Sequence, residues 1–349
     1  MIAWFLEDKK EIKDKVKNLE KESLELLDMI KQEVEYYNVY YELYTKLREG
    51  SSLNTPAKKA ALKQRYPESL FAEEKLPRSK HGQRRFYLCK AFYYRLLGDL
   101  KKAHAAFLQT EKWWQENHLI KQEDSFGFVS DLLNVIRSHM INEEFEVVEK
   151  KLKQLDKLEK ENKNPHLDRF IFDNIMYTRQ VYYMNLENYP KALKLVPKIE
   201  KGLAKYADDI SNYLALIYNV AVAFFLDGDY KGCMNWSPQI TALRGEGFFI
   251  HLRKSIRLLQ ICSCFELDND EFPFLSNWRT INTYFKRMGA RENVDFELKT
   301  MAFMKEMYQS TAFDKTANAF QQFLKSQMKS PPPSGCQELS IWLSKYSTI

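Results

Sequence analysis

The feature that most constrains this 349-residue chain is a short turn pattern that recurs along most of its length. The pattern is clearest in FFLDGDYKGCMNW, Phe224 to Trp236, where an apolar run stops at Asp-Gly-Asp, an aromatic follows, and a small residue comes three positions later. The apolar residue after each turn marks six positions, at intervals of 45, 44, 41, 42 and 41 residues: Leu100, Phe145, Tyr189, Tyr230, Phe272 and Phe313. A near-constant period of this length is typical of a solenoid.

Each repeat is predicted to be a helix, a turn of two or three residues, and a second helix that begins at the apolar mark. Pro190 and Pro273 directly follow their marks, where a residue in the first helical turn can lack its N–H at no cost. Pro197 and Pro238 each lie eight residues after their marks. Because an interior proline removes a backbone hydrogen bond, both second helices are expected to bend there.

The pattern resembles the tetratricopeptide repeat, whose turn reads Gly-Asp/Asn-Tyr, with Ala three residues on and an aromatic four beyond that. The best match is Gly98, Asp99, Ala103 and Phe107. The family's small residue inside the first helix recurs in three units, as Ala91, Ala221 and Ser263. The longer period is similar to that of the Rap-type peptide receptors of bacteria. This resemblance implies an all-α fold, a right-handed α-solenoid of about six such helix-turn-helix repeats over residues 82–328.

Residues 1–81 are predicted to be a helical segment with one long helix over residues 8–49. Seam positions recur there in alternating steps of four and three, the pattern of a coiled coil: Ile12, Val16, Leu19, Ser23, Leu26, Ile30, Glu33, Tyr37, Tyr40, Tyr44 and Leu47. The seam can be buried against the chain's own short segments and first repeat, or against a second copy in a homodimer. Since Ser23 and Glu33 weaken a coiled coil, packing within the chain is favoured.

Residues 329–349 are predicted to be a proline-rich linker and one amphipathic helix. That helix carries Ile341, Trp342 and Tyr346. Because the last repeat of an array needs a cover for its apolar face, we expect the helix to dock there as a cap. Residues 50–81 are expected to hold one short helix between two loops.

The composition narrows the class of protein. The formal charge is +6, from 53 basic and 47 acidic side chains interleaved along the sequence, which is typical of solvated helix faces and gives weak support to nucleic-acid binding. The five cysteines are odd in number and lie mostly in apolar runs, which favours a reducing compartment. The apolar amino terminus is too short for a secretory signal, so a cytoplasmic protein is expected.

No catalytic pattern rises above background, so an enzyme, a cofactor and a metal are not expected. The six histidines are scattered, without an HExxH pair or a His/Cys cluster at ligand spacing. Phosphate-cradling glycine patterns are absent as well. Trp113 and Trp114 point about 100° apart on a helix, so one is expected in the core and the other toward the next repeat or solvent.

In tetratricopeptide arrays the first helices line the concave surface, and the resemblance places ligand-facing positions on them: Arg85, Phe92, Arg95, Asn134, Arg137, Asn174, Tyr177, Tyr218, Asn219 and Arg257. This mixture suits an extended peptide, because amides bond its backbone, aromatics cover apolar side chains, and Arg binds the carboxylates of acidic or carboxy-terminal segments. The sequence therefore predicts a non-enzymatic scaffold or adaptor that binds a protein or peptide. A Rap-like regulatory receptor that switches a second protein is the alternative, and nucleic-acid binding ranks below both.

Overall fold

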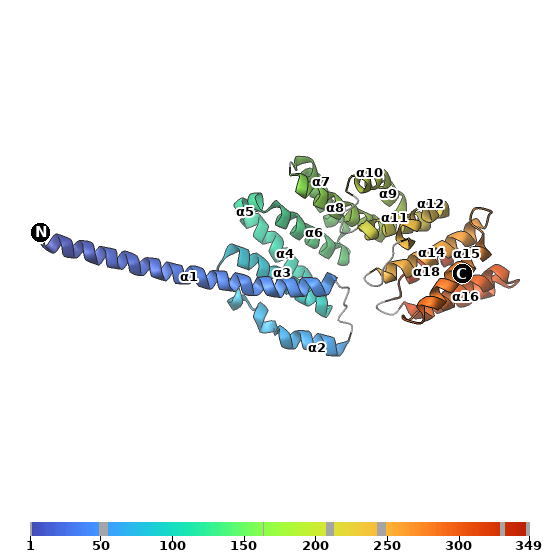
Figure 1. Ribbon diagram of the computed structural model, residues 1–349, viewed down its shortest axis with the longest axis horizontal. Coiled ribbons are helices and arrows are strands. Elements are labelled where there is room, and N and C mark those ends of the chain that lie inside the picture. The colour runs from blue at the N-terminus through green and yellow to red at the C-terminus, as the bar shows by residue number, and fades with distance from the viewer. Residues whose placement is uncertain are drawn as a thin grey trace. The chain divides into compact units, whose positions relative to one another are not determined.

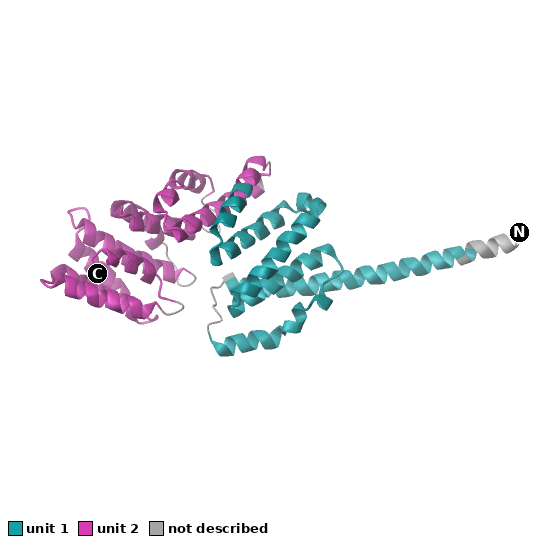
Figure 2. Ribbon diagram, turned by 180° about the vertical axis from the view of Figure 1, so that it is seen from behind, with its two compact units in different colours: residues 1–154 teal, residues 155–349 magenta. Residues whose placement is uncertain are grey.

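The computed structural model describes residues 2–48, 55–162, 164–206, 213–242, 249–328 and 332–346. Within these ranges the chain consists of helices and their connections, without strands, so the prediction of an all-α protein is confirmed. The chain divides into two compact units, residues 1–154 and 155–349 (Figure 2). None of the described helices combines the length and the apolar character that crossing a bilayer requires.

Unit 1 begins with the long helix α1 and continues with short helices and the first helix pairs (Figure 1). Its elements are α1 (Ile2–Arg48), α2 (Pro56–Arg65), the 3-10 helices η1 (Glu68–Phe71) and η2 (Glu73–Lys75), α3 (Lys80–Leu97), α4 (Leu100–Glu116), α5 (His118–Glu123) and α6 (Ser125–Ile141). The next helix, α7 (Phe145–Glu161), contains the boundary between the units. The short helix predicted within residues 50–81 is α2, and residues 49–54 lie outside the described ranges.

Unit 2 continues with helix pairs and ends on a short helix (Figure 1). Its elements are α8 (Pro165–Asn185), α9 (Tyr189–Leu193), α10 (Val196–Tyr206), α11 (Tyr213–Asp227), α12 (Tyr230–Trp236), α13 (Pro238–Thr241), α14 (Ile250–Leu267), α15 (Phe274–Met288), α16 (Asp295–Gln309), α17 (Phe313–Gln327) and α18 (Cys336–Ser344). Two second helices are interrupted near Pro197 and Pro238, between α9 and α10 and between α12 and α13. The bends predicted from these prolines are therefore present as breaks.

Five of the six apolar marks are the first residues of helices: Leu100, Phe145, Tyr189, Tyr230 and Phe313. The prediction is wrong at Phe272, because α15 begins two residues later, at Phe274. Asp268 has a positive φ of 26° and its carboxylate accepts a hydrogen bond from the N–H of Phe274 at 3.0 Å. This bond lengthens the turn, so Pro273 precedes the helix instead of lying in its first turn.

Four junctions between paired helices share one backbone geometry. In each case a residue with a left-handed φ, between 52° and 87°, lies one or two residues after the first helix: Gly98, Glu143, Glu187 and Gly228. At three junctions the next side chain caps the second helix by accepting a hydrogen bond from the N–H three residues on, at 2.8–3.3 Å: Asp99, Asn188 and Asp229. At these turns one helix ends and the next begins with at most three residues between them.

A buried ion pair joins three helices of unit 1. Arg84 on α3 donates from Nε to the carboxylate of Asp131 on α6 at 2.6 Å, and Trp114 Nε1 on α4 donates to the same carboxylate at 2.8 Å. The Arg84 guanidinium also lies 4.7 Å from the Trp114 ring. Trp113 is buried too, so one tryptophan enters the core and the other contacts the next helix pair, as predicted.

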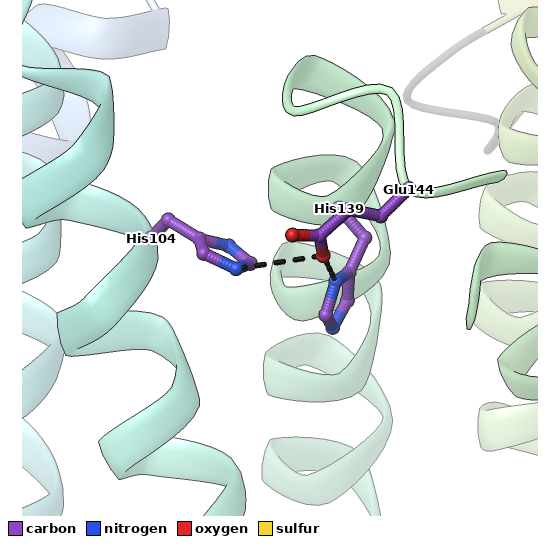
Figure 3. Close-up of side chains that lie close together, drawn as sticks. All are labelled: His104, His139 and Glu144. Atoms are coloured by element: carbon purple, nitrogen blue, oxygen red, sulfur yellow. Dashed lines mark hydrogen bonds and ion pairs between the residues drawn. The ribbon is translucent and has the colours of Figure 1, made fainter.

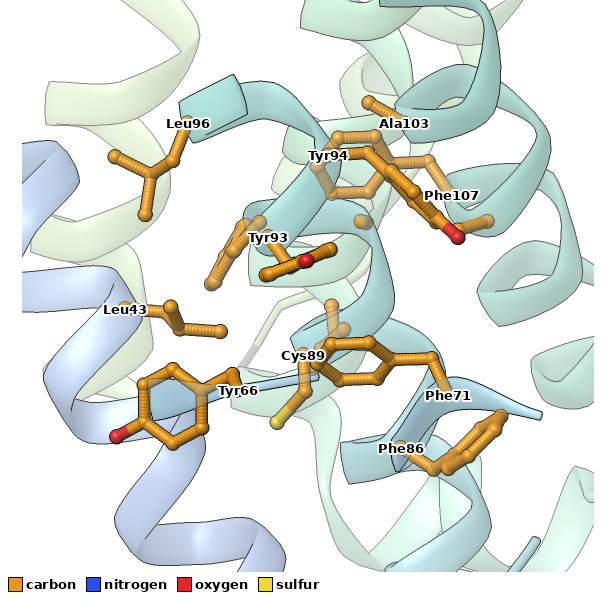
Figure 4. Packing of buried hydrophobic residues seen from close by; sticks show 14 of the residues in the cluster. Leu43, Tyr66, Phe71, Phe86, Cys89, Tyr93, Tyr94, Leu96, Ala103 and Phe107 are labelled. Carbon is orange, nitrogen blue, oxygen red and sulfur yellow. The ribbon is translucent and has the colours of Figure 1, made fainter. Parts of the chain in front are cut away.

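The second half of α1 is packed against α3 in the apolar core of unit 1 (Figure 4). Tyr36 and Leu43 are buried, and the Tyr36 hydroxyl donates to the carbonyls of Leu70 and Lys75 at 3.0 and 3.2 Å. Packing of this half within the chain is therefore confirmed: the seam residue Tyr40 packs against this core, although the buried residues are Tyr36 and Leu43. Their seam neighbours at positions 37 and 44 stay 52% and 38% exposed.

We expect opposite effects of substitutions at the left-handed position of two different turns. Gly228→Ala should lower the free energy of unfolding by about 1 kcal/mol, because a Cβ makes φ = 87° unfavourable. No steric clash adds to this cost, since the Cβ would meet nothing within 4 Å. Glu187→Gly should raise that free energy by about 0.5 kcal/mol, since relief of the left-handed strain exceeds the entropy that glycine adds to the unfolded chain. Urea unfolding measures both.

The control for the glutamate change is Glu200→Gly, at an exposed position inside α10. This variant should lose about 1 kcal/mol, because glycine disfavours a helix interior. Destabilisation of Glu187→Gly as large as that of Glu200→Gly would contradict the left-handed geometry of the turn.

Candidate functional site

The ten ligand-facing positions predicted from the sequence all lie on the first helices of their pairs. We call the side of these helices that carries them the first-helix face. In unit 1 it is formed by α3 (Arg85, Phe92 and Arg95) and α6 (Asn134 and Arg137). Unit 2 has a first-helix face of its own, formed by α8 (Asn174 and Tyr177), α11 (Tyr218 and Asn219) and α14 (Arg257).

In unit 1, α1 covers the first-helix face of α3. The Arg85 guanidinium lies 4.5 Å from the centre of the Tyr40 ring and 5.4 Å from that of Tyr37. Phe92 is buried, and its ring centre lies 5.5 Å from Tyr40 and 6.1 Å from Tyr44. Two predicted ligand positions are therefore covered by tyrosine side chains of α1.

In unit 2, α18 packs against α11 and α14 as well as against α17, the helix before it. The Tyr218 hydroxyl on α11 donates to the Glu338 carboxylate of α18 at 3.2 Å and shares a 2.7 Å hydrogen bond with Ser255 on α14. Gly335, with φ = 86°, approaches the same serine so closely that a Cβ would lie 2.9 Å from its Oγ. The carboxy-terminal helix thus contacts a predicted ligand position directly.

Burial changes the electrostatics of this contact. It raises the pKa of the Glu338 carboxyl, while the hydrogen bond from Tyr218 opposes that rise. Burial also raises the pKa of the Tyr218 phenol well above its ordinary value. Tyr218 therefore acts as a neutral hydrogen-bond donor to an acidic group on the docked segment.

Glu266, near the end of α14, is the main polar anchor of α18. Its carboxylate accepts hydrogen bonds from Trp342 Nε1 at 2.7 Å and from the Tyr346 hydroxyl at 2.6 Å, and it pairs with Lys345 at 2.5 Å. The neighbouring Phe265 ring lies 5.9 Å from Trp342, edge to face. One first helix therefore supplies both the acceptor and the aromatic contact for the end of the chain.

The other predicted positions differ in what they offer to a ligand. Asn174 is buried and donates to the Phe170 carbonyl at 3.0 Å. The Arg257 guanidinium lies 3.9 Å from the Tyr284 ring, and burial lowers the pKa of this arginine. The remaining positions are half-buried, so parts of them face solvent: Arg95, Asn134, Arg137, Tyr177 and Asn219.

The structure also brings together a cluster that the sequence analysis missed (Figure 3). His104 on α4, His139 near the end of α6 and Glu144 in the following turn offer ligand atoms within 4.8 Å of one another. His139 Nδ1 is hydrogen-bonded to the Glu144 carboxylate, which lowers the pKa of that carboxyl. Burial, and then the neighbouring His139, lower the pKa of His104. The two histidines are 35 positions apart, so a search for short ligand spacings does not find them.

Searches against family models, curated proteins and solved structures find no match for this chain.

We expect Glu266→Ala to loosen α18. Three donors lose their common acceptor, which costs about 2 kcal/mol, so hydrogen exchange in residues 336–344 should accelerate at least tenfold. The matched control is Glu271→Ala, which removes only an exposed ion pair with Lys231 and should leave this exchange unchanged. Equal exchange in both variants would show that Glu266 does not hold the helix.

Proposed function

We propose that this protein is a non-enzymatic scaffold or adaptor that binds a protein or peptide segment on the first-helix face of a tetratricopeptide-like solenoid. The observation that carries the proposal is the docking of α18 on α11 and α14, with its acidic Glu338 at the predicted ligand position Tyr218. A face that holds one segment of the chain in this way has the shape and the polar groups to hold a similar segment of a partner.

The packing of neighbouring helix pairs supports the solenoid. Second helices contact the first helices of the following pairs, as α4 does with α6, α12 with α14, and α15 with α16. Within unit 2, consecutive first helices also contact each other: α8 with α11, α11 with α14, and α14 with α16. Side-by-side stacking of this kind is typical of helical repeat proteins.

The contacts of α18 indicate the chemistry of a suitable partner. This helix buries an apolar stripe with helical spacing, formed by Cys336, Leu339, Trp342 and Leu343. Its Glu338 meets the hydroxyl donor of Tyr218. The favoured ligand is therefore an amphipathic helical segment with an acidic residue in its first turn, bound in the helix-in-groove mode. The five cysteines are unpaired, which supports a cytoplasmic setting.

A regulatory receptor is the second candidate, and one observation favours it. Both α1 and α18 lie on first helices, where they cover Arg85, Phe92 and Tyr218. A ligand that reaches these positions must displace a helix of the chain itself. Binding would then release an amphipathic segment, which is the behaviour of a switch.

Cleavage of the linker tests the binding face. In full-length protein with a protease site inserted at residues 329–331, the severed α18 segment should stay bound and be displaced saturably by excess synthetic peptide of residues 332–346. The same peptide with Trp342→Ala should compete at least tenfold less well, since deletion of a buried indole costs about 3 kcal/mol or more. Immediate loss of the severed segment, or equal competition by both peptides, would contradict the proposal.

The exposed half of α1 supports a homodimer. Its seam side chains at Ile12, Val16, Leu19, Leu26 and Ile30 are 48–61% exposed. The residues at heptad positions a are Val16, Ser23 and Ile30, and those at d are Ile12, Leu19 and Leu26. β-branched residues at a with leucine at d favour a parallel two-stranded coiled coil. The proposed occupant of this stripe is therefore the same stripe of a second copy.

Charge and polarity agree with a parallel, in-register pair. Lys15 at position g precedes Glu20 at position e by five residues, the spacing at which these side chains pair across a parallel coiled coil. The Ser23 hydroxyl in the seam can form a hydrogen bond when it faces Ser23 of the second copy. This pairing favours the in-register alignment of the two helices.

We expect the double change Leu19→Glu and Leu26→Glu to convert a dimer into a monomer, because it places four carboxylates in one apolar seam. Light scattering after size exclusion measures the mass. Lys21→Glu, on the outer side of the helix, is the control and should leave the dimer intact. A monomeric wild-type protein would refute this mode of association.

A further inference from the structure

We propose that His104, His139 and Glu144 form a binding site for a divalent transition-metal ion of the zinc class. The site lies where the start of one second helix, α4, meets the end of the next first helix, α6, and the turn that follows it. This inference does not depend on the proposed binding of a peptide.

One of the three pairs of ligand atoms already has nearly the spacing that such an ion requires. Zinc bonds of 2.0–2.2 Å in a tetrahedron place ligand atoms about 3.3 Å apart. His104 Nε2 lies 3.6 Å from the Glu144 carboxylate oxygen, and that oxygen is also in contact with His139 Nδ1. Figure 3 shows both histidine rings directed at the same carboxylate from two different helices. An ion would separate His139 Nδ1 from that oxygen and draw the three ligand atoms, which lie within 4.8 Å of one another, to its own spacing.

A hydrogen bond outside the cluster sets the orientation of His104. Its Nδ1 lies 2.7 Å from the Ser138 hydroxyl. When Nδ1 carries the proton and donates to Ser138, Nε2 presents its lone pair to the Glu144 carboxylate. Two acceptors then face each other across 3.6 Å, and a cation between them satisfies both. Ligating histidines are commonly held in this way by a hydrogen bond from their other nitrogen.

His139 offers only one nitrogen to the site. The ring is buried, and among the described residues its Nε2 has no hydrogen-bond partner, whereas Nδ1 contacts Glu144. A metal at Nδ1 takes the place of the proton in that hydrogen bond, and the ring takes up a proton at Nε2, so it stays neutral. The Glu144 carboxylate then balances one of the two charges of the ion.

The ligand set selects the class of metal. Two imidazole nitrogens and one carboxylate oxygen suit zinc and its neighbours, while calcium and magnesium prefer all-oxygen sites. The Glu144 side chain is 43% exposed, which gives an ion a path from solvent and leaves the fourth position for water. Because its ligands come from two neighbouring helix pairs, the bound ion would cross-link them.

The test uses the full-length protein after treatment with a chelator. Calorimetric titration with Zn²⁺ should give one site per chain, and Co²⁺ should produce the visible absorption of a tetrahedral site. Glu144→Gln and His104→Ala should each weaken Zn²⁺ binding at least tenfold. His118→Ala is the control, because this exposed histidine lies outside the cluster, and it should bind like the wild type.

Glu144→Gln keeps the size of an exposed side chain, so it separates loss of a ligand from loss of the fold, which circular dichroism checks. If Zn²⁺ does not bind the wild type saturably, or binds the Glu144→Gln variant with unchanged affinity, the three residues form only a hydrogen-bonded pair beside a second imidazole. Either result would overturn the metal site.

Discussion

The turn between paired helices depends on a single residue in the left-handed conformation, placed directly before an acidic or amide side chain. Gly98, Glu143, Glu187 and Gly228 occupy this position at four junctions. Two of them are glutamates, although a Cβ disfavours that conformation by roughly 1 kcal/mol. Reversal of the chain at this point lets a second helix pack on its partner and on the next pair, so the strain is offset by burial that the turn makes available.

The junctions could be predicted because their signals are local: a helix end, a cap and an apolar residue follow one another within a few positions. The prediction failed at Phe272 because the Asp268 carboxylate caps a residue six positions away and lengthens the turn. In α1 the predicted seam packs against the core in part, but it missed the buried Tyr36, whose hydroxyl donates to the Leu70 and Lys75 carbonyls. Both acceptors lie in the 3-10 helices η1 and η2. The heptad pattern of α1 carries no information on where those helices lie.

The same distinction applies to the candidate sites. The spacing of the turns predicted which residues lie on the first helices. It did not predict that α1 and α18, near the two ends of the sequence, cover some of them, through contacts such as that of Tyr218 with Glu338, 120 residues apart. The approach of His104 to His139 likewise requires one helix pair to stack on the next. The types of side chain can be read from a sequence, whereas their approach to one another depends on how neighbouring helix pairs pack.

Tethering of α18 sets a threshold for any competing ligand. A segment joined to its binding face by a short linker has an effective concentration in roughly the millimolar range. A free segment with the same contacts as α18 would therefore displace it only near that concentration, since the apparent affinity falls with the fraction of open face. A partner that adds contacts beyond those of α18, for example with the half-buried Tyr177 and Asn219, gains affinity that the tethered helix cannot match. Occupation of the face by the chain's own end thus favours partner segments that are longer than α18 over segments of the same length.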